Sequence, residues 1–187
     1  LVTTPYGEVK VKYGEFGGKK VAFLSRHGEG ATVPPHKINY RANIYALKKL
    51  GVEKVIATAA VGSLCDKVDI GTIILVDQFL DFTKGRLSTF HDGGPEGVRH
   101  TDMTEPYCPE LRGVLEAEAL SIGLNVRNGG CYVCTEGPRF ETAAEVRMFR
   151  LLGGDVVGMT GVPEVVLARE AGLCYASITM VSNLAAG

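Results

Sequence analysis

Residues 129–183 read GGCYVCTEGPRFETAAEVRMFRLLGGDVVGMTGVPEVVLAREAGLCYASITMVSN, and this stretch decides the fold of the chain. Along it the predicted elements alternate: strands at 129–136, 155–159 and 173–183, and helices at 142–152 and 163–172. Apolar, β-branched runs mark the strands, while Pro163 near the start and Gly172 at the end delimit the second helix. Such alternation is typical of a mixed or parallel sheet covered by helices. We therefore predict an α/β fold of three layers, with helices flanking a mixed, largely parallel β-sheet.

The chain before this stretch continues the same pattern. We predict buried strands at 20–25 and 54–60 with a helix at 37–51 between them, then a strand at 72–79 and a helix at 109–121. The polar segment from Leu80 to Pro106 is rich in Gly, Asp, His and Thr, and loops of such length are usually functional or disordered. No repeat or linker divides the chain, so we predict a single domain, residues 1–187.

The overall composition excludes several classes of protein. A net charge of -1 provides no basic surplus for binding nucleic acid or an acidic membrane surface. No apolar run reaches the roughly 18 residues of a membrane span, and the amino end has no signal-peptide pattern. We therefore expect a cytoplasmic protein with no nucleic-acid partner and no membrane partner.

The cysteines favour reduced thiols over a disulfide framework, because they are odd in number and scattered along the chain. The five are Cys65, Cys108, Cys131, Cys134 and Cys174. Cys131 and Cys134 form a lone CxxC motif, but a strand would point them to opposite faces, so we predict no metal or redox role. The chain also has no GxxxxGK[ST], no GxGxxG after a strand and no HExxH, and we predict no metal site.

Polar or small residues stand where several predicted strands end, which is where open α/β sheets bind ligands. Arg26 and His27 follow one strand, and a guanidinium suits bidentate capture of phosphate, although a solvated Arg beside a packed His is the ordinary alternative. The small side chains of Ala59 and Ala60 would let an anion approach the backbone, or would simply pack. Thr160 precedes a helix, where its hydroxyl either caps the helix or donates to a bound anion.

Taken singly, the remaining polar or apolar candidates have ordinary structural explanations. Met159 and Phe140 would be core residues, Glu141 a first-turn helix carboxylate, and Asn183 a turn residue. Taken together, the motifs resemble the trimeric family of purine nucleoside phosphorylases and methylthioadenosine phosphorylases. The matching motifs are RHG at 26–28, PPHKINYRAN at 34–43, TAAVGS at 58–63, EPYCP at 105–109, TEGPRFET at 135–142 and GMTGVPEVVLAREAGLCYAS at 158–177. The resemblance runs from about Thr4 to the end of the chain.

This resemblance implies the nucleoside phosphorylase fold, a homotrimer and a reaction with phosphate. A purine nucleoside and phosphate would give the free base and ribose 1-phosphate, or its 5-methylthio analogue, without a metal or an organic cofactor. Carried over by motif, phosphate would be bound by Arg26, His27, the Ala59 and Ala60 backbone and the Thr160 hydroxyl. Met159 would lie against the ribose, and Phe140 would contact the base or the sugar.

The family also implies which residues would read and activate the base. Glu141 as a carboxylate can accept from the N1–H of a 6-oxopurine, and the Asn183 amide can donate to O6 or N7, with Leu184 and Ala185 beside it in the base pocket. Adenine-preferring relatives typically carry a small hydroxyl residue at the position of Glu141 and aspartates at those of Asn183 and Ala185. The departures predict a preference for hypoxanthine or guanine, and the rival within the family is an adenine-type methylthioadenosine phosphorylase.

The sugar side leaves two substrates open. His100 matches a residue that in the methylthio branch reaches the 5' substituent of a neighbouring subunit's ligand, so 5'-methylthioinosine fits as readily as inosine or guanosine. The family's Gly-rich phosphate loop and its C-terminal segment are not in residues 1–187, and we expect them outside this stretch. A non-catalytic purine-binding module is the hypothesis from another class.

Overall fold

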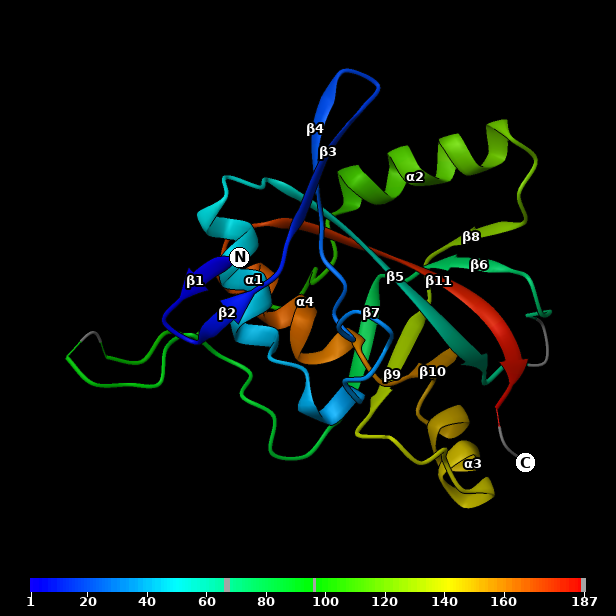
Figure 1. Ribbon diagram of the computed structural model, residues 1–187. Coiled ribbons are helices and arrows are strands. Elements are labelled where there is room, and N and C mark those ends of the chain that lie inside the picture. Colours follow the sequence, from blue (N-terminus) through cyan, green and yellow to red (C-terminus); the bar gives the residue numbers. More distant parts are fainter. Residues whose placement is uncertain (66–67, 96, 186–187) are drawn as a thin grey trace.

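A sheet of mixed direction forms the centre of the molecule (Figure 1). The computed structural model describes residues 1–65, 68–95 and 97–185. Within these residues the central sheet has seven strands in the order β7-β9-β10-β5-β11-β6-β8. Their bounds are β5 Lys54–Ser63, β6 Ile73–Leu75, β7 Gln78–Phe82, β8 Val126–Asn128, β9 Cys131–Thr135, β10 Val156–Gly158 and β11 Cys174–Leu184.

Most neighbours in this sheet run parallel, which confirms the predicted mixed and largely parallel α/β fold. The pairs β7–β9, β9–β10, β5–β11 and β6–β8 are parallel, whereas β10–β5 and β11–β6 are antiparallel. The β5–β11 ladder is the longest and contains a bulge between Val181 and Asn183. The β10–β5 pairing is short and stops at Val157↔Gly62. Beyond this pair, the chain that follows β10 does not pair with β5. A pocket lies between that chain and β5.

Helices pack against this sheet and against each other. Their bounds are α1 Tyr40–Lys49, α2 Pro109–Ser121, α3 Ala143–Leu151 and α4 Gly161–Glu170. Helix α4 packs on β9 and β11, α1 packs on α4, and α2 packs on β6, β8 and β11. The main core joins these layers, with Ile44 of α1, Val165 of α4 and Val181 of β11 all at most 2 % exposed. No helix in the described part of the chain is long and apolar enough to cross a membrane.

The four predicted helices are present, with ends set by local chemistry. Helix α1 begins later than expected because the Asn39 side chain accepts from the backbone N–H of Ala42, while Pro35–Lys37 forms a separate 3₁₀ turn. Helix α3 begins at a capping box in which Thr142 and Glu145 satisfy each other's backbone N–H groups.

Two strand predictions are wrong in detail. The single strand predicted at 72–79 is two strands, β6 and β7, which have different neighbours and lie toward opposite edges of the sheet. The strand predicted as buried at 20–25 is β4, Lys19–Phe23, which is mostly exposed and pairs only with β3, Lys12–Phe16, in a separate hairpin. The apolar run thus indicated a strand correctly, but it did not indicate the strand with which it pairs. A second small hairpin, β1 Val2–Thr4 with β2 Gly7–Val9, packs on α1 and was not predicted.

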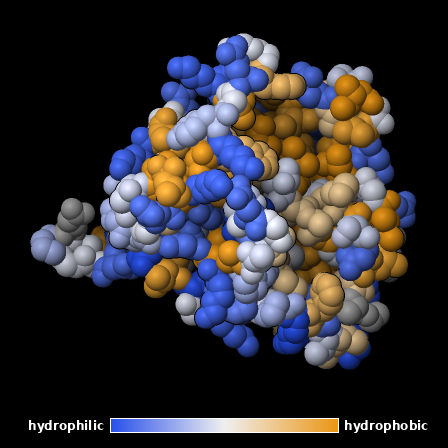
Figure 2. All heavy atoms as spheres, viewed as in Figure 1, coloured by the Kyte–Doolittle hydropathy of each residue, from blue (hydrophilic) through white to orange (hydrophobic). Residues whose placement is uncertain are grey.

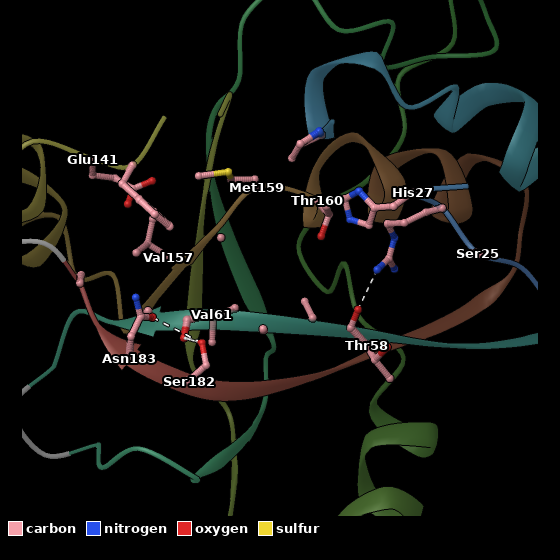
Figure 3. Close-up of a pocket in the computed structure, with 18 of the residues that line it drawn as sticks. Ser25, His27, Thr58, Val61, Glu141, Val157, Met159, Thr160, Ser182 and Asn183 are labelled. Carbon is pink, nitrogen blue, oxygen red and sulfur yellow. Dashed lines mark hydrogen bonds between the residues drawn. The ribbon is translucent and has the colours of Figure 1, made fainter. Parts of the chain in front are cut away.

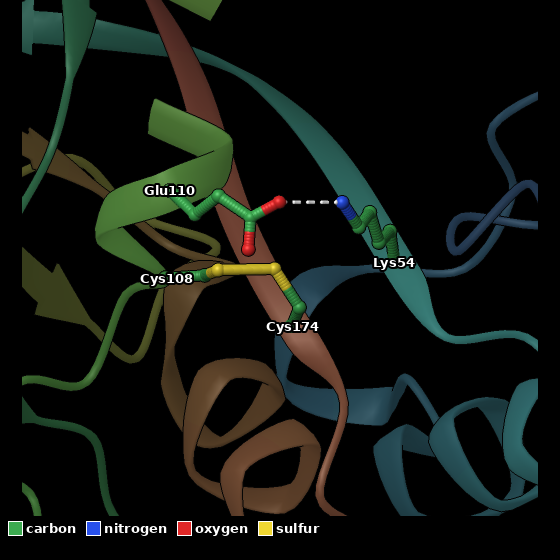
Figure 4. Close-up of a disulfide and its surroundings, with 4 residues drawn as sticks. All are labelled: Lys54, Cys108, Glu110 and Cys174. Carbon is green, nitrogen blue, oxygen red and sulfur yellow. Dashed lines mark hydrogen bonds and ion pairs between the residues drawn. A yellow bond between two sulfur atoms is a disulfide. The ribbon is translucent and has the colours of Figure 1, made fainter. Parts of the chain in front are cut away.

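The expectation of reduced cysteines is also wrong for one pair. Cys108 and Cys174 form a disulfide with a Cα–Cα distance of 5.2 Å (Figure 4). The two are 66 residues apart, but the Cys108 N–H donates to the carbonyl oxygen of Tyr175 at 2.8 Å, so the start of α2 lies beside the start of β11. Only this packing, which the spacing of the cysteines does not reveal, brings the two sulfurs together. Cys65, Cys131 and Cys134 are free.

Candidate active site

A pocket of about 690 Å³ opens where the β10–β5 pairing stops. Its walls come from the segment after β4, the carboxyl halves of β5 and β11, the loop after β9 and the residues that follow β10. Every predicted site residue except His100 lines it: Arg26, His27, Ala59, Ala60, Phe140, Glu141, Met159, Thr160, Asn183, Leu184 and Ala185. Residues from distant parts of the sequence therefore form one cavity.

The residues of this pocket divide between two ends (Figure 3). His27, Thr58 and Thr160 lie toward one end, Glu141 and Asn183 lie at the other, and the Met159 side chain lies between them. The first set carries groups suited to an anion, and the second carries a carboxylate and an amide suited to a heterocyclic base. The resemblance seen in the sequence implied the same division, with phosphate at the first end and the purine at the second.

Arg26 is held rigidly at the anion end. Its Nε and Nη2 donate to the two carboxylate oxygens of Glu164 at 2.8 and 2.7 Å, and its Nη1 donates to the Thr58 carbonyl oxygen at 2.7 Å. Burial disfavours the guanidinium charge, but the Glu164 carboxylate outweighs this effect and raises the pKa of Arg26 further above its ordinary value. The side chain is thus charged and fixed in direction.

His27 is hydrogen-bonded through one of its ring nitrogens to the backbone of Val33. Its Nδ1 lies 2.9 Å from the Val33 carbonyl oxygen, and because a carbonyl only accepts, Nδ1 carries the hydrogen. The second ring nitrogen, Nε2, is thereby left to face a ligand, since His27 lines the pocket.

Thr160 is the residue for which the sequence left two roles open, capping a helix or donating to an anion. It occupies the N-cap position of α4, yet its side chain makes no capping hydrogen bond. The residue is 8 % exposed and lines the pocket, while its backbone N–H donates to the Tyr132 hydroxyl at 3.3 Å. Thr160 therefore lies in the pocket wall at the start of α4, and its side chain does not cap the helix.

Glu141 and Asn183 form the opposite end. The Glu141 side chain is buried, and its Oε1 accepts a hydrogen bond from the Thr135 hydroxyl at 2.7 Å. This bond orients the carboxylate through one oxygen and leaves Oε2 for a ligand. Asn183 follows the bulge in β11 and lines the same cavity. Phe140 lines the pocket although it is 72 % exposed, which places it at the mouth.

His100 does not join the other residues. It is exposed and lies outside the pocket lining of its own chain, in the segment between β7 and α2.

Several residues that support the pocket were not singled out from the sequence. Arg86 comes from the segment predicted as functional or disordered, and its side chain is only 5 % exposed. It donates to the carbonyl oxygens of Thr135, Glu136, Met159 and Val162 at 3.2, 2.8, 2.9 and 2.7 Å. It therefore joins the chain after β9 to the chain after β10, which are the two segments that carry Glu141 and Thr160. An arginine in a long polar segment was the available signal, but nothing local indicates burial.

Within residues 1–65, 68–95 and 97–185, no cluster of three or more His, Cys, Asp or Glu side chains is arranged to hold a metal ion. Burial raises the pKa of the Cys134 thiol to about 12, so this thiol is protonated at neutral pH.

Comparison with known proteins agrees with this geometry. All of the chain, residues 1–187, matches the phosphorylase superfamily, and the chain belongs to that family. It is 60% identical over 186 residues to a probable 6-oxopurine nucleoside phosphorylase of Moorella thermoacetica, an alignment that covers 100% of this chain and 72% of the relative.

Two further relatives carry related names. The 6-oxopurine nucleoside phosphorylase of Pyrococcus furiosus is 56% identical, and a probable S-methyl-5'-thioinosine phosphorylase of Methanopyrus kandleri is 54% identical, each over 100% of this chain and 72% of the relative. Among solved structures, methylthioadenosine phosphorylase of Schistosoma mansoni in complex with tubercidin superposes with a TM-score of 0.93 at 38% identity, covering 98% of this chain and 74% of that one.

Proposed function

We propose that this protein is a 6-oxopurine nucleoside phosphorylase, a pentosyltransferase that acts in purine salvage. The observation that carries the proposal is the buried Glu141 carboxylate, oriented by Thr135 at one end of a pocket whose other end is lined by Arg26, His27 and Thr160. Family membership and the names of the relatives support the same activity. Inorganic phosphate is the co-substrate, and the proposed reaction uses no metal and no organic cofactor.

The geometry supports a specific division of labour. Phosphate is held by Arg26, His27, the Thr160 hydroxyl and the Ala59 and Ala60 backbone, on the side of the ribose opposite the base. As the N-glycosidic bond breaks, the sugar gains oxocarbenium character and the purine gains negative charge. A phosphate oxygen forms a bond to the ribose anomeric carbon, and the electron pair of the broken N-glycosidic bond leaves with the purine. The Asn183 amide donates to the purine, while Met159 and Phe140 line the pocket beside sugar and base.

Base preference follows from the hydrogen-bonding pattern of Glu141. A 6-oxopurine presents an N1–H donor to the free carboxylate oxygen, whereas adenine presents a lone pair at N1. A buried acceptor facing an acceptor costs on the order of 1–3 kcal/mol. Since Thr135 restrains the carboxylate through Oε1, Glu141 cannot easily turn away from the mismatch. The adenine-type alternative is therefore disfavoured.

The 5' substituent and the assembly are proposals of their own. Relatives named for 6-oxopurine nucleosides and for methylthioinosine have similar identity to this chain, so inosine, guanosine and 5'-methylthioinosine are all proposed substrates. We further propose a homotrimer in which His100 reaches the site of a neighbouring subunit. Figure 2 shows apolar side chains gathered over β5, β11 and α2, and exposed apolar patches of this kind are typical of interfaces.

A cytoplasmic location is also kept as a proposal. It rests on the purine nucleosides and phosphate that the proposed reaction uses. The Cys108–Cys174 disulfide is unusual for that location, because the cytosol of most organisms keeps thiols reduced.

The decisive experiment measures base release from inosine, guanosine and 5'-methylthioinosine, with and without inorganic phosphate. We expect release that depends on phosphate and yields a sugar 1-phosphate. Equal release without phosphate would show a hydrolytic nucleosidase instead. Faster turnover of methylthioadenosine than of methylthioinosine would support the adenine-type alternative, and hypoxanthine binding without any turnover would support a non-catalytic module.

A further inference from the structure

A buried carboxylate lies behind the anion end of the pocket. Glu164 belongs to the first turn of α4, its side chain is 7% exposed, and it does not line the cavity. Its Oε1 accepts from Arg26 Nη2 at 2.7 Å and from the Tyr175 hydroxyl at 2.8 Å, and its Oε2 accepts from Arg26 Nε at 2.8 Å. A carboxylate inside a protein is costly unless it is paired and hydrogen-bonded, and here both oxygens are satisfied.

The consequence for Arg26 follows from counting its donors. A guanidinium has five N–H groups. The Nε–H and one N–H of Nη2 are used by Glu164, and one N–H of Nη1 is used by the Thr58 carbonyl. One N–H remains on each terminal nitrogen, and Arg26 lines the pocket. These two donors form a fork that matches two oxygens of a single oxyanion.

We propose that Glu164 is a positioning residue for phosphate: it holds the Arg26 guanidinium so that its two remaining N–H groups bind the co-substrate. This proposal rests on the proposed function. Tyr175 supports the arrangement from behind, because its hydroxyl donates to the same carboxylate and its ring is buried against Tyr107. The role is indirect, since Glu164 contacts Arg26 and not the ligand.

The substitution Glu164→Gln tests the role with little change of shape. The amide oxygen can still accept from one Arg26 N–H, but the NH₂ group then faces the second N–H, donor against donor. The guanidinium is therefore displaced. The loss of the Glu164 charge has the opposite effect, because an unneutralised guanidinium attracts phosphate more strongly. We expect the displacement to have the larger effect, because charge-assisted hydrogen bonds depend steeply on alignment, whereas solvent weakens attraction between charges in an open pocket.

The expected result is selective for phosphate. With Glu164→Gln, KM for phosphate at saturating inosine rises by about ten- to a hundredfold, while KM for inosine at saturating phosphate changes by less than about threefold. Titration calorimetry with inorganic phosphate alone should show the same weakening. Glu110→Gln is the matched control, because it makes the same change in an exposed ion pair with Lys54 at 2.9 Å, outside the pocket.

Each other outcome has a defined meaning. An unchanged KM for phosphate, or an equal rise in both KM values, would overturn the proposal in favour of a structural ion pair. If Glu164→Gln does not fold, Tyr175→Phe decides, because it removes only the hydroxyl bond to Oε1: a several-fold rise in KM for phosphate alone supports the role, and no rise refutes it. If the unaltered protein releases no base, the proposed function fails, and calorimetry with phosphate still tests Glu164 independently.

Discussion

At the scale of single residues, Glu141 and Asn183 reach the same end of the pocket from different elements. Glu141 comes from the loop after β9, and Asn183 from the end of β11. One is an acceptor fixed by Thr135 and the other is an amide that can donate and accept. The proposed function gives the choice of purine to this pair, because its donors and acceptors would complement a 6-oxopurine and oppose adenine.

The substitution Asn183→Asp tests this assignment. An aspartate accepts from the adenine 6-amino group and can no longer donate to O6 of an oxopurine. We expect the ratio of kcat/KM for methylthioadenosine to kcat/KM for methylthioinosine to rise by about tenfold or more. Steady-state kinetics with both nucleosides measures it, and an unchanged ratio would show that Asn183 does not select the base.

At the scale of elements, the start of α3 is held by one carboxylate with several partners. Glu145 accepts from the two terminal nitrogens of Arg139 at 2.8 and 2.7 Å and from the Thr142 backbone N–H at 2.7 Å. The hydrogen bond from Arg139 is the largest cause, and that from the Thr142 backbone is the second, of a pKa of Glu145 lowered to about 2. The unfolded chain, with its higher pKa, binds more protons in this range. Stability from Glu145 is therefore complete above about pH 4.5 and is lost as the pH falls toward 2.

The lowered pKa of Glu145 predicts the behaviour of Glu145→Gln. The variant should melt at a lower temperature than the unaltered protein at pH 6, and the difference should shrink as the pH approaches 2. Thermal melts followed by circular dichroism at several pH values provide the test. A difference that stays constant down to the lowest pH would mean that the charge of Glu145 is not what stabilises α3.

Strand β10 makes a second prediction at this scale, because it packs directly on an aromatic ring. A Cβ added at Gly158 would overlap the Tyr132 hydroxyl oxygen and lie 2.7 Å from Cζ of that ring. We expect Gly158→Ala to lower the free energy of unfolding by about 1–3 kcal/mol. It should also reduce activity, since Tyr132 bonds the Thr160 backbone.

Gly113 in α2 provides the control for this substitution. A Cβ there meets nothing within 4 Å, and its φ is not in the left-handed region. Gly113→Ala should therefore raise the free energy of unfolding by about 0.5–1 kcal/mol, because glycine is unfavourable inside a helix. Urea denaturation of both variants measures the contrast, and equal stabilities would contradict the packing described for β10.

At the scale of the whole molecule, the Cys108–Cys174 disulfide joins the start of α2 to the start of β11. It closes a loop of 66 residues, for which the chain-entropy account gives a stabilisation of up to about 4 kcal/mol. Neither cysteine lines the main pocket. The disulfide should therefore affect stability much more than catalysis.

We expect Cys108→Ala to lower the free energy of unfolding by about 2–4 kcal/mol, which lowers the urea midpoint. At moderate temperature, kcat/KM should change little. A reducing agent should produce the same shift in the unaltered protein and no further shift in the variant. Cys65→Ala, which alters a free cysteine, is the control. Equal urea midpoints for Cys108→Ala and the unaltered protein would show that the bond contributes nothing.

The part of the fold that local patterns control was predictable. Helices α2, α3 and α4 and strands β9, β10 and β11 lie close to their predicted bounds, because apolar periodicity and the Pro and Gly signals act within a few residues. The run at 72–79 was predicted as one strand because its break at Val76 and Asp77 depends on different pairing partners. The hairpin strand β4 looked buried because apolar content does not reveal exposure.

The sequence by itself determined the family, the alternation of strands and helices, and the chemical types at the pocket, since motifs and periodicity are local properties. Only the tertiary structure decided how these residues are supported. Glu164 meets Arg26 across 138 positions, Arg86 enters from a polar segment to join two strand ends, and Cys108 meets Cys174. The physical reason is that such contacts depend on strand order and helix packing, in which residues far apart in the chain become neighbours without any local signal.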